Sequence, residues 1–312
     1  MKSNINKRKI ISNLLNNHIF IRVSVSFLIL GKTHESLLLL RNIIENLIYH
    51  RLRRKYLKFA RMYYENQKNQ KSNHKKSNIV WVCWLQGMDK APSIVKACYR
   101  SLKRILKNKE IIVISFNNMN DFIKLPDYII KKYEKGYISK TELSDMIRLE
   151  LLIKYGGLWI DSTVLCTGDK LIESISNEDL FMFQILKPGF DGHTLRFSNW
   201  FIYANSNNEV LMLTRYLMYT YWKRNNKLAS YFLFHNFLEI AFQLYPQAYR
   251  NILPFSSELP HELQLCLFDS FDIKKFNFIC QQSDFHKLTY KVDKDNKNKK
   301  ETYYEYIIKT IK

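Results

Sequence analysis

Short apolar runs alternate with longer amphipathic stretches along the chain, a pattern that predicts an α/β fold. The runs at 79–84 and 110–115 are rich in Ile and Val and are predicted to be strands. Residues 92–107 between them have helical spacing, so the three pieces form a βαβ unit with parallel strands. Further strands are predicted at 158–160, 181–184 and 198–204, and packed helices at 210–222, 229–244 and 301–311.

The segment 139–163 contains the most informative order of residues. Ser139 and Glu142 have the spacing of a capping box, which starts a helix at about residue 141. The glycine pair at 156–157 ends that helix, because glycine adopts the left-handed conformation without a steric penalty. Residues 158–160 then form a short strand that is apolar on both faces, as expected inside a mostly parallel sheet.

Three charged residues of this segment are candidates for binding a phosphate-bearing ligand. Asp145 and Arg148 lie one turn apart on the predicted helix and point the same way. Asp161 follows the strand at its carboxyl end, the edge at which open α/β sheets bind ligands. An Asp/Arg pair at this spacing is usually a surface ion pair worth a few tenths of a kcal/mol. The order of acid, base, helix end, strand and acid is what favours a ligand site.

The motif Ser-Asp-x-x-Arg-x-x-x-Leu-x-x-Tyr-Gly-Gly-x-x-x-Asp over 144–161 resembles the core of glycosyltransferases with a DXD sugar-binding region. That group includes capsular polysaccharide synthesis proteins, family 32 enzymes such as the yeast-type mannosyltransferases, and the clostridial glucosylating toxins. The pieces at 79–87, 159–163 and 285–290 look most like the bacterial capsular polysaccharide branch. The resemblance implies a GT-A fold, a nucleotide-sugar-binding α/β sandwich with a mostly parallel central sheet.

The resemblance also implies roles for individual residues. Asp145 would hydrogen-bond hydroxyls of the donor sugar, and Arg148 would contact the donor near its sugar or phosphates. Asp161 matches the first Asp of DXD, which contacts the ribose or, through a divalent ion, the diphosphate. These are the three expected catalytic residues. The expected donor-binding residues are Trp84, Gln86, Gly87, Ser144, Gly157, Asn199, Trp200, His286 and Lys287.

Thr163 stands where DXD has its second Asp. That Asp usually supplies the direct metal carboxylate, and a hydroxyl is a much weaker ligand for Mn²⁺ or Mg²⁺. Two alternatives follow. Asp161 holds the ion with waters and phosphate oxygens, or the residues Arg148, His286 and Lys287 take over part of the charge neutralisation.

The function implied by the resemblance is transfer of a hexose-type sugar, with retention of configuration, in capsule or O-antigen synthesis. The donor would be a nucleotide-sugar, with a UDP-sugar favoured, and the acceptor a glycan or lipid-linked oligosaccharide. Retaining enzymes of this fold generally lack an obvious nucleophile, so we expect front-face attack within an ion pair. Thr163 leaves open a catalytically inactive, sugar-nucleotide-binding scaffold of a polysaccharide assembly complex.

Positive charge is concentrated at the N-terminus. Residues 1–76 contain 17 Lys or Arg against 3 Glu, which is +14 of the total net charge of +21. We expect this part to be a helical extension with a long helix at 37–64 and a linker at 67–77, followed by one catalytic domain at 77–312. The apolar run at 19–30 is too short to span a bilayer. Either the extension contacts the anionic cytoplasmic face of a membrane, or it packs on the domain with a solvated basic face.

The remaining composition narrows the class of protein. The basic balance also fits nucleic-acid binding, but no helix-turn-helix, zinc or RNP-type pattern accompanies it, so no nucleic-acid partner is expected. The five cysteines lack metal-binding spacing and are expected to be reduced core residues of a cytoplasmic protein without structural zinc. With 46% hydrophobic residues in 312, the chain has enough apolar surface for a full core.

Overall fold

The computed structural model describes residues 19–67, 73–186, 194–292, 296 and 299–311. Within these residues, a five-stranded sheet has the order β2-β1-β3-β6-β5. β1 is parallel to β2 and β3, β6 is antiparallel to β3, and β5 is antiparallel to β6, so only β6 runs against the others. The predicted α/β fold with a mostly parallel central sheet is confirmed. The strands are β1 (Ile79–Cys83), β2 (Glu110–Ile114), β3 (Gly157–Ile160), β5 (Leu180–Gln184) and β6 (Phe197–Ala204).

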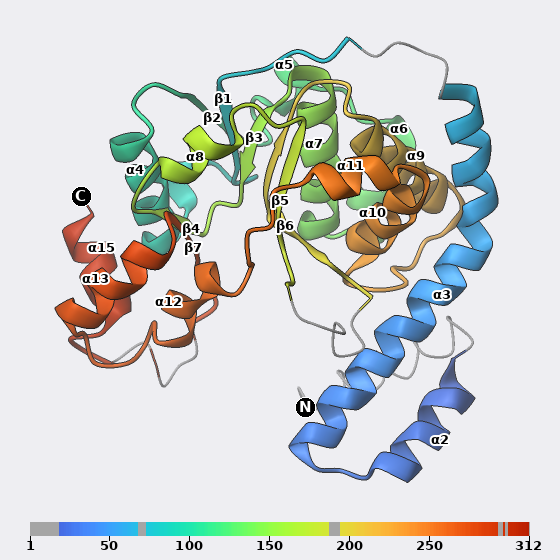
Figure 1. Ribbon diagram of the computed structural model, residues 1–312, viewed down its shortest axis with the longest axis horizontal. Helices are drawn as coiled ribbons and strands as arrows, with labels where there is room; N and C mark the ends of the chain where they lie inside the picture. The colour runs from blue at the N-terminus through green and yellow to red at the C-terminus, as the bar shows by residue number, and fades with distance from the viewer. Residues whose placement is uncertain (1–18, 68–72, 187–193, 293–295, 297–298, 312) are drawn as a thin grey trace.

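Helices lie on both sides of this sheet (Figure 1). In that view α7, α9 and α10 lie to the right of the strands, and α4 and α8 to the left. The largest side chains between these layers, among them Trp81, Trp159 and Phe201, are at most 1% exposed. The helices are α4 (Ser93–Ile105), α5 (Met119–Phe122), α6 (Asp127–Glu134), α7 (Lys140–Tyr155), α8 (Lys170–Ile175), α9 (Glu209–Arg224), α10 (Leu233–Leu244) and α11 (Pro246–Asn251).

The boundaries of α7 follow the sequence prediction. Glu142 Oε2 accepts from Ser139 N over 2.8 Å, and the Ser139 hydroxyl caps the first turn, so the capping box is present. Gly156 caps the other end with φ of 68°. Gly157, at φ of 99°, opens β3, and a Cβ there would lie 2.5 Å from the carbonyl oxygen of Ile79. The glycine pair therefore ends the helix and also lets β3 approach β1.

A second, smaller layer combines the segment after β3 with the C-terminal part of the chain. β4 (Val164–Cys166) and β7 (Phe285–Lys287) form an antiparallel pair beside α4. Leu165 pairs with His286 in this ladder, which brings residues 285–287 next to the segment that follows β3. The surrounding helices are the short 3-10 helices η1 (Met88–Lys90) and η3 (Leu259–His261), with α12 (Glu262–Leu265), α13 (Ile273–Gln282) and α15 (Tyr303–Thr310).

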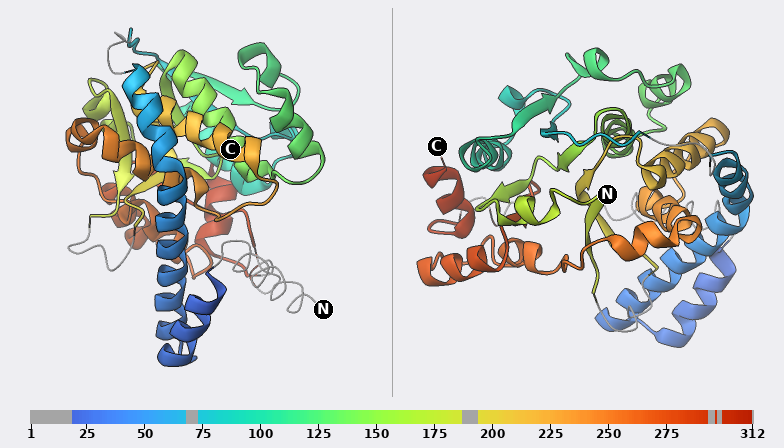
Figure 2. Two further views of the ribbon diagram at one scale, coloured as in Figure 1. Left: turned by 90° about the vertical axis from the view of Figure 1, so that its right-hand side faces the viewer. Right: turned by 45° about the horizontal axis from the view of Figure 1, so that its top comes forward.

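The N-terminal extension is helical, as predicted. α2 (Phe20–Leu30) folds back on the first half of α3 (His34–Gln67), and both extend beyond the body of the molecule (Figure 2). The second half of α3 packs on α9 and α10, where Tyr56 is fully buried with its ring centroid 5.2 Å from that of Phe237. No helix of the described ranges is both long and apolar enough to cross a bilayer.

Several boundaries differ from the sequence prediction or lie partly outside the described residues; the long helix predicted at 37–64, for example, spans 34–67. The helix predicted at 229–244 begins at Leu233, because Ser230 forms a turn whose carbonyl accepts from Leu233 N. Of the predicted linker 67–77, residues 68–72 lie outside the described ranges, while Lys75 exchanges hydrogen bonds with Ser206. The last helix, predicted at 301–311, spans 303–310 with Thr302 as its N-cap.

Candidate functional site

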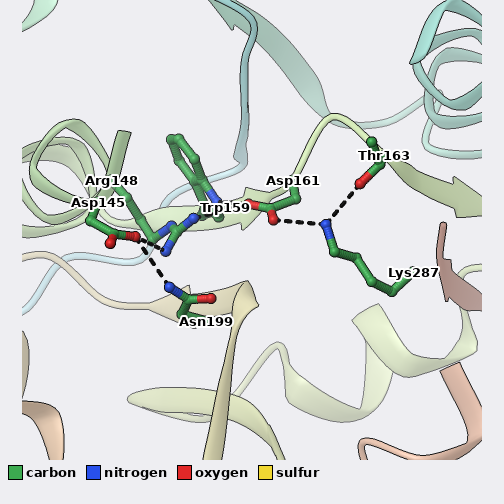
Figure 3. A network of polar contacts seen from close by, with 7 residues as sticks. All are labelled: Asp145, Arg148, Trp159, Asp161, Thr163, Asn199 and Lys287. Atoms are coloured by element: carbon green, nitrogen blue, oxygen red, sulfur yellow. Dashed lines mark hydrogen bonds and ion pairs between the residues drawn. The ribbon is translucent and has the colours of Figure 1, made fainter. Parts of the chain in front are cut away.

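Arg148 joins two carboxylates at the carboxyl end of β3. Its Nη1 donates to Asp145 Oδ1 over 2.8 Å, and its Nη2 donates to Asp161 Oδ1 over 2.9 Å (Figure 3). Asp145 and Arg148 are 6% and 3% exposed, whereas the side chain of Asp161 is 26% exposed. The predicted common direction of Asp145 and Arg148 on α7 is thus observed, with Asp161 as a third member.

Trp159 supports this arrangement in a way that the sequence reasoning missed. Its Nε1 donates to Asp161 Oδ1 over 2.9 Å, and its ring lies 4.7 Å from the guanidinium carbon of Arg148. A ring face at this distance attracts a cation. The available signal was the i,i+2 spacing of Trp159 and Asp161, because alternate residues of an extended segment share a face.

Lys287 contacts the same carboxylate from the second layer. Its Nζ donates to Asp161 Oδ2 over 2.9 Å and to Thr163 Oγ1 over 2.7 Å (Figure 3). Its side chain is 20% exposed. Asp145, Arg148, Asp161 and Lys287 together form what we call the charged cluster, in which two acids face two bases.

The two acids have opposite pKa shifts. Burial raises the pKa of Asp145 to about 7, against the lowering effect of Arg148. Burial also opposes ionisation of Asp161, but Lys287 and Arg148 together hold its pKa below the usual range. At neutral pH Asp161 is therefore a fixed anion, whereas Asp145 is close to its titration point. Carboxylates with separated pKa values are typical of functional sites.

Neighbouring residues of β6 point to different sides. Asn199 Nδ2 donates to Asp145 Oδ1 over 3.1 Å. Trp200 is 5% exposed and stacks on Phe183, with ring centroids 4.8 Å apart. Because strand side chains alternate between faces, Asn199 contacts the charged cluster and Trp200 packs in the core.

The predicted donor-binding residues His286 and Lys287 also point to opposite sides of their strand. His286 is fully buried, and its Nε2 lies 3.0 Å from Thr167 Oγ1 rather than beside Asp161. Burial lowers the pKa of His286 to about 4, so the imidazole is neutral at pH 7. The structure brings Lys287 to the charged cluster and leaves His286 on the other side of β7.

The remaining predicted donor-binding residues lie at different ends of the sheet. Ser144 hydrogen-bonds the thiol of Cys83, the last residue of β1, next to the end of β3. Gly157 opens β3 at the far end, roughly 13 Å from Asp161 at 3.3 Å per residue. The loop after β1 contains half-buried Trp84, exposed Gln86 and half-buried Gly87.

Comparison with known proteins identifies the family. A family model described as capsular polysaccharide synthesis protein matches residues 33–307. The chain belongs to the capsular polysaccharide synthesis protein family. The match includes the charged cluster and all of α3. No curated protein matches the sequence.

Solved structures add a distant likeness. The one titled PaToxG glycosyltransferase is 14% identical, with a TM-score of 0.39, over 84% of this chain and 97% of that chain. A likeness at this level assigns no role to individual residues.

The charged cluster of this capsular polysaccharide synthesis protein fits a divalent ion poorly. Mn²⁺ and Mg²⁺ require several oxygen ligands, but Asp161 already accepts from three donors and Thr163 from Lys287. A divalent ion 4 Å from an ammonium is repelled by about 8 kcal/mol at an effective dielectric constant of about 20. No group of three or more His, Cys, Asp or Glu in the described ranges is arranged as metal ligands.

Proposed function

We propose that this protein transfers a hexose-type sugar from a nucleotide-sugar, with a UDP-sugar favoured, to a glycan acceptor in surface polysaccharide synthesis. The observation that carries the proposal is the bridge from Asp145 through Arg148 to Asp161, at the sheet edge where α/β folds bind nucleotides. Family membership supports the same role. Residues 77–312 would form the catalytic domain and residues 1–76 the extension.

Each member of the bridge has a chemical role in this proposal. Both described contacts of Asp145 go to Oδ1, so Oδ2 is available to accept a hydrogen bond from a sugar hydroxyl. Arg148 is held between two acids and over a ring, so its guanidinium has a fixed position. In this proposal it contacts the donor near its sugar or phosphates. Asp161 orients both Arg148 and Lys287. A site preorganised in this way stabilises charge without reorganising during the reaction.

The proposed mechanism retains the anomeric configuration of the donor. The acceptor hydroxyl attacks C1 from the face that the leaving group departs from. Its proton passes to the phosphate oxygen that receives the electron pair of the broken glycosidic bond. The protein then needs no nucleophile, and its contribution is position and charge stabilisation.

A membrane-bound acceptor would agree with the surface of the extension. On α2, Ile21, Leu28 and Ile29 are 77–80% exposed, and the basic run at 51–58 lies further along α3. Helical segments that carry both exposed apolar and basic side chains are typical of proteins that lie on anionic membranes. We propose that this hairpin contacts the cytoplasmic face of the membrane, where lipid-linked glycans are assembled.

Vesicle sedimentation tests this contact. The protein should sediment with vesicles containing phosphatidylglycerol and much less with pure phosphatidylcholine. Replacing Leu28 and Ile29 together with Ser should reduce binding, while Leu265→Ser, at an 84% exposed residue of α12, should not. Equal binding of both variants would refute the contact.

Donor turnover tests the catalytic proposal. The purified protein should bind one of a panel of UDP-, GDP- and CMP-sugars, seen as a thermal shift, and slowly release the nucleotide. Asp161→Ala should abolish the release. Binding without turnover, even with extracts containing glycan acceptors, would favour the inactive scaffold instead. Salt-sensitive binding to random duplex DNA that Asp145→Ala leaves unchanged would favour a nucleic-acid-binding protein.

A further inference from the structure

The Lys287 ammonium lies between the first and third residues of the Asp161-Ser162-Thr163 segment. Nζ is 2.9 Å from Asp161 Oδ2 and 2.7 Å from Thr163 Oγ1. These are the positions of the first and second Asp in the DXD region that the segment resembles, and the second of them usually supplies the direct metal carboxylate. In this chain the position between them is filled by a side chain of the protein itself.

The backbone holds Lys287 in this place. β7 pairs Lys287 with Val164, and Leu288 N donates to the carbonyl of Thr163 over 2.9 Å. The lysine and the Asp-Ser-Thr segment are therefore neighbours in one hydrogen-bonded ladder. An ammonium has three N–H donors. Two are used by described side chains, and the third is left for a ligand of this side chain, which is 20% exposed.

The charges balance in the same way as in a metal site. An Asp-x-Asp segment with a divalent ion sums to zero. Asp161 and Thr163 with one lysine ammonium also sum to zero, because the loss of one carboxylate is matched by the loss of one positive charge. A chain with Thr163 but without Lys287 would leave Asp161 facing an incoming diphosphate with less compensation.

We infer that Lys287 takes the place of the divalent cation, so that this protein binds and releases the donor diphosphate without a metal. The inference rests on the proposed sugar transfer. As the bond from C1 to the phosphate oxygen breaks, its electron pair goes to that oxygen. Lys287 donates a hydrogen bond to the diphosphate and stays protonated, while the proton of the acceptor hydroxyl is taken up by the departing phosphate.

Nucleotide titrations test this without requiring an acceptor. Calorimetry measures the affinity for UDP and for GDP, each in EDTA and in MnCl₂. For whichever nucleotide binds, the affinities in EDTA and in MnCl₂ should agree within about twofold. Lys287→Met should lower the affinity for the nucleoside diphosphate by about 10- to 100-fold, because one charge-assisted contact is lost. The affinity for the matching nucleoside, uridine or guanosine, should change by less than about twofold. Lys291→Met, at an exposed lysine of the following loop, is the control.

Two more variants keep the test independent of folding. Lys287→Arg retains the charge and should recover part of the affinity if Lys287→Met proves unstable. Thr163→Asp combined with Lys287→Met restores the second carboxylate and removes the ammonium. This double variant should bind the nucleoside diphosphate only with Mn²⁺ or Mg²⁺.

Loss of wild-type binding in EDTA with recovery in Mn²⁺ would overturn the inference, as would an unchanged affinity of Lys287→Met. If neither nucleotide binds with or without metal, the proposed sugar transfer itself fails, and inorganic pyrophosphate then tests Lys287 alone. Pyrophosphate binding in EDTA that Lys287→Met abolishes would still support the inference. Pyrophosphate that does not bind, or binds both proteins equally, would refute it.

Discussion

Arg148 on α7 and Asp161 after β3 are joined by a 2.9 Å hydrogen bond, although 13 positions separate them in the sequence. The bond ties the helix to the strand that follows it. Arg148 is 3% exposed and lies over the Trp159 ring, so the ion pair is shielded from water on several sides. Screening by salt is weak for such a pair, and its geometry is fixed before any ligand arrives.

Arg148→Lys should damage both activity and stability. Lysine keeps the charge but has no planar fork, so it cannot donate to Asp145 and Asp161 in the same way. We expect donor turnover to fall at least about 100-fold, and the free energy of unfolding to fall by about 2 kcal/mol. Urea denaturation and nucleotide release measure the two effects.

The matched control is Arg215→Lys. Arg215 also makes a 2.9 Å ion pair, with Glu150, but its side chain is 28% exposed. Exposed pairs contribute about 1 kcal/mol or less. Wild-type turnover in Arg148→Lys, or equal loss in the two variants, would contradict the role given to Arg148.

Asp145→Asn should separate binding from transfer. Because burial raises the pKa of Asp145 to about 7, a neutral amide replaces a group that is already partly protonated at neutral pH. The fold and nucleotide affinity should therefore persist. Transfer should fall about 100- to 1,000-fold, since the amide is a weaker acceptor for a sugar hydroxyl. Transfer at the wild-type rate, as expected for the exposed control Asp121→Asn, would remove Asp145 from the mechanism.

Local sequence signals predicted the elements that hold the candidate site. The capping box at Ser139 and the glycine pair at 156–157 depend only on residues a few positions apart. The same holds for the shared direction of Asp145 and Arg148, which follows from helix geometry. Strand positions followed from apolar runs bounded by polar residues.

Long-range pairing produced what the sequence did not predict. Lys287 and Asp161 are 126 positions apart, and their contact depends on the register of β4 and β7. The same register decides that His286 points away from Asp161 while Lys287 points toward it. Three-residue strands have no hydrophobic pattern long enough to define such a register from sequence.

His286 should make the protein sensitive to acid. Its pKa is lowered by burial from 6.5 to about 4, so the folded state binds no proton where the unfolded chain does. Stability is therefore complete above pH 6.5 and falls as the pH decreases toward 4. At pH 5, His286 should lower the free energy of unfolding by about 2 kcal/mol relative to its value above pH 6.5.

Urea denaturation at pH 7.5 and pH 5.0 tests this effect. His286→Gln removes the titrating group but keeps a hydrogen-bonding side chain for Thr167. The variant should lose less stability than the wild type between the two pH values, whatever its stability at pH 7.5. His50→Gln, at an exposed histidine on α3, should follow the wild type. Parallel pH profiles for wild type and His286→Gln would show that His286 does not titrate in this way.

Gly157→Ala should be far more damaging than the same change at Gly136. Both glycines have positive φ, 99° and 73°. An alanine at either position should therefore cost about 1–2 kcal/mol in the free energy of unfolding, because its Cβ disfavours the left-handed backbone. At Gly136 an added Cβ meets nothing within 4 Å. At Gly157 it would lie 2.5 Å from the Ile79 carbonyl, a backbone atom of β1 that cannot rotate away.

The clash at Gly157 forces β1 and β3 apart, and with them the sheet edge that holds Asp161. We expect Gly157→Ala to lower the free energy of unfolding by at least about 4 kcal/mol, and Gly136→Ala by no more than about 2 kcal/mol. Urea denaturation measures both values. If Gly157→Ala does not fold, the fraction of soluble protein is compared between the two variants instead. Equal losses would mean that β3 can move away from β1 without cost, and that glycine is needed at 157 only for its backbone angle.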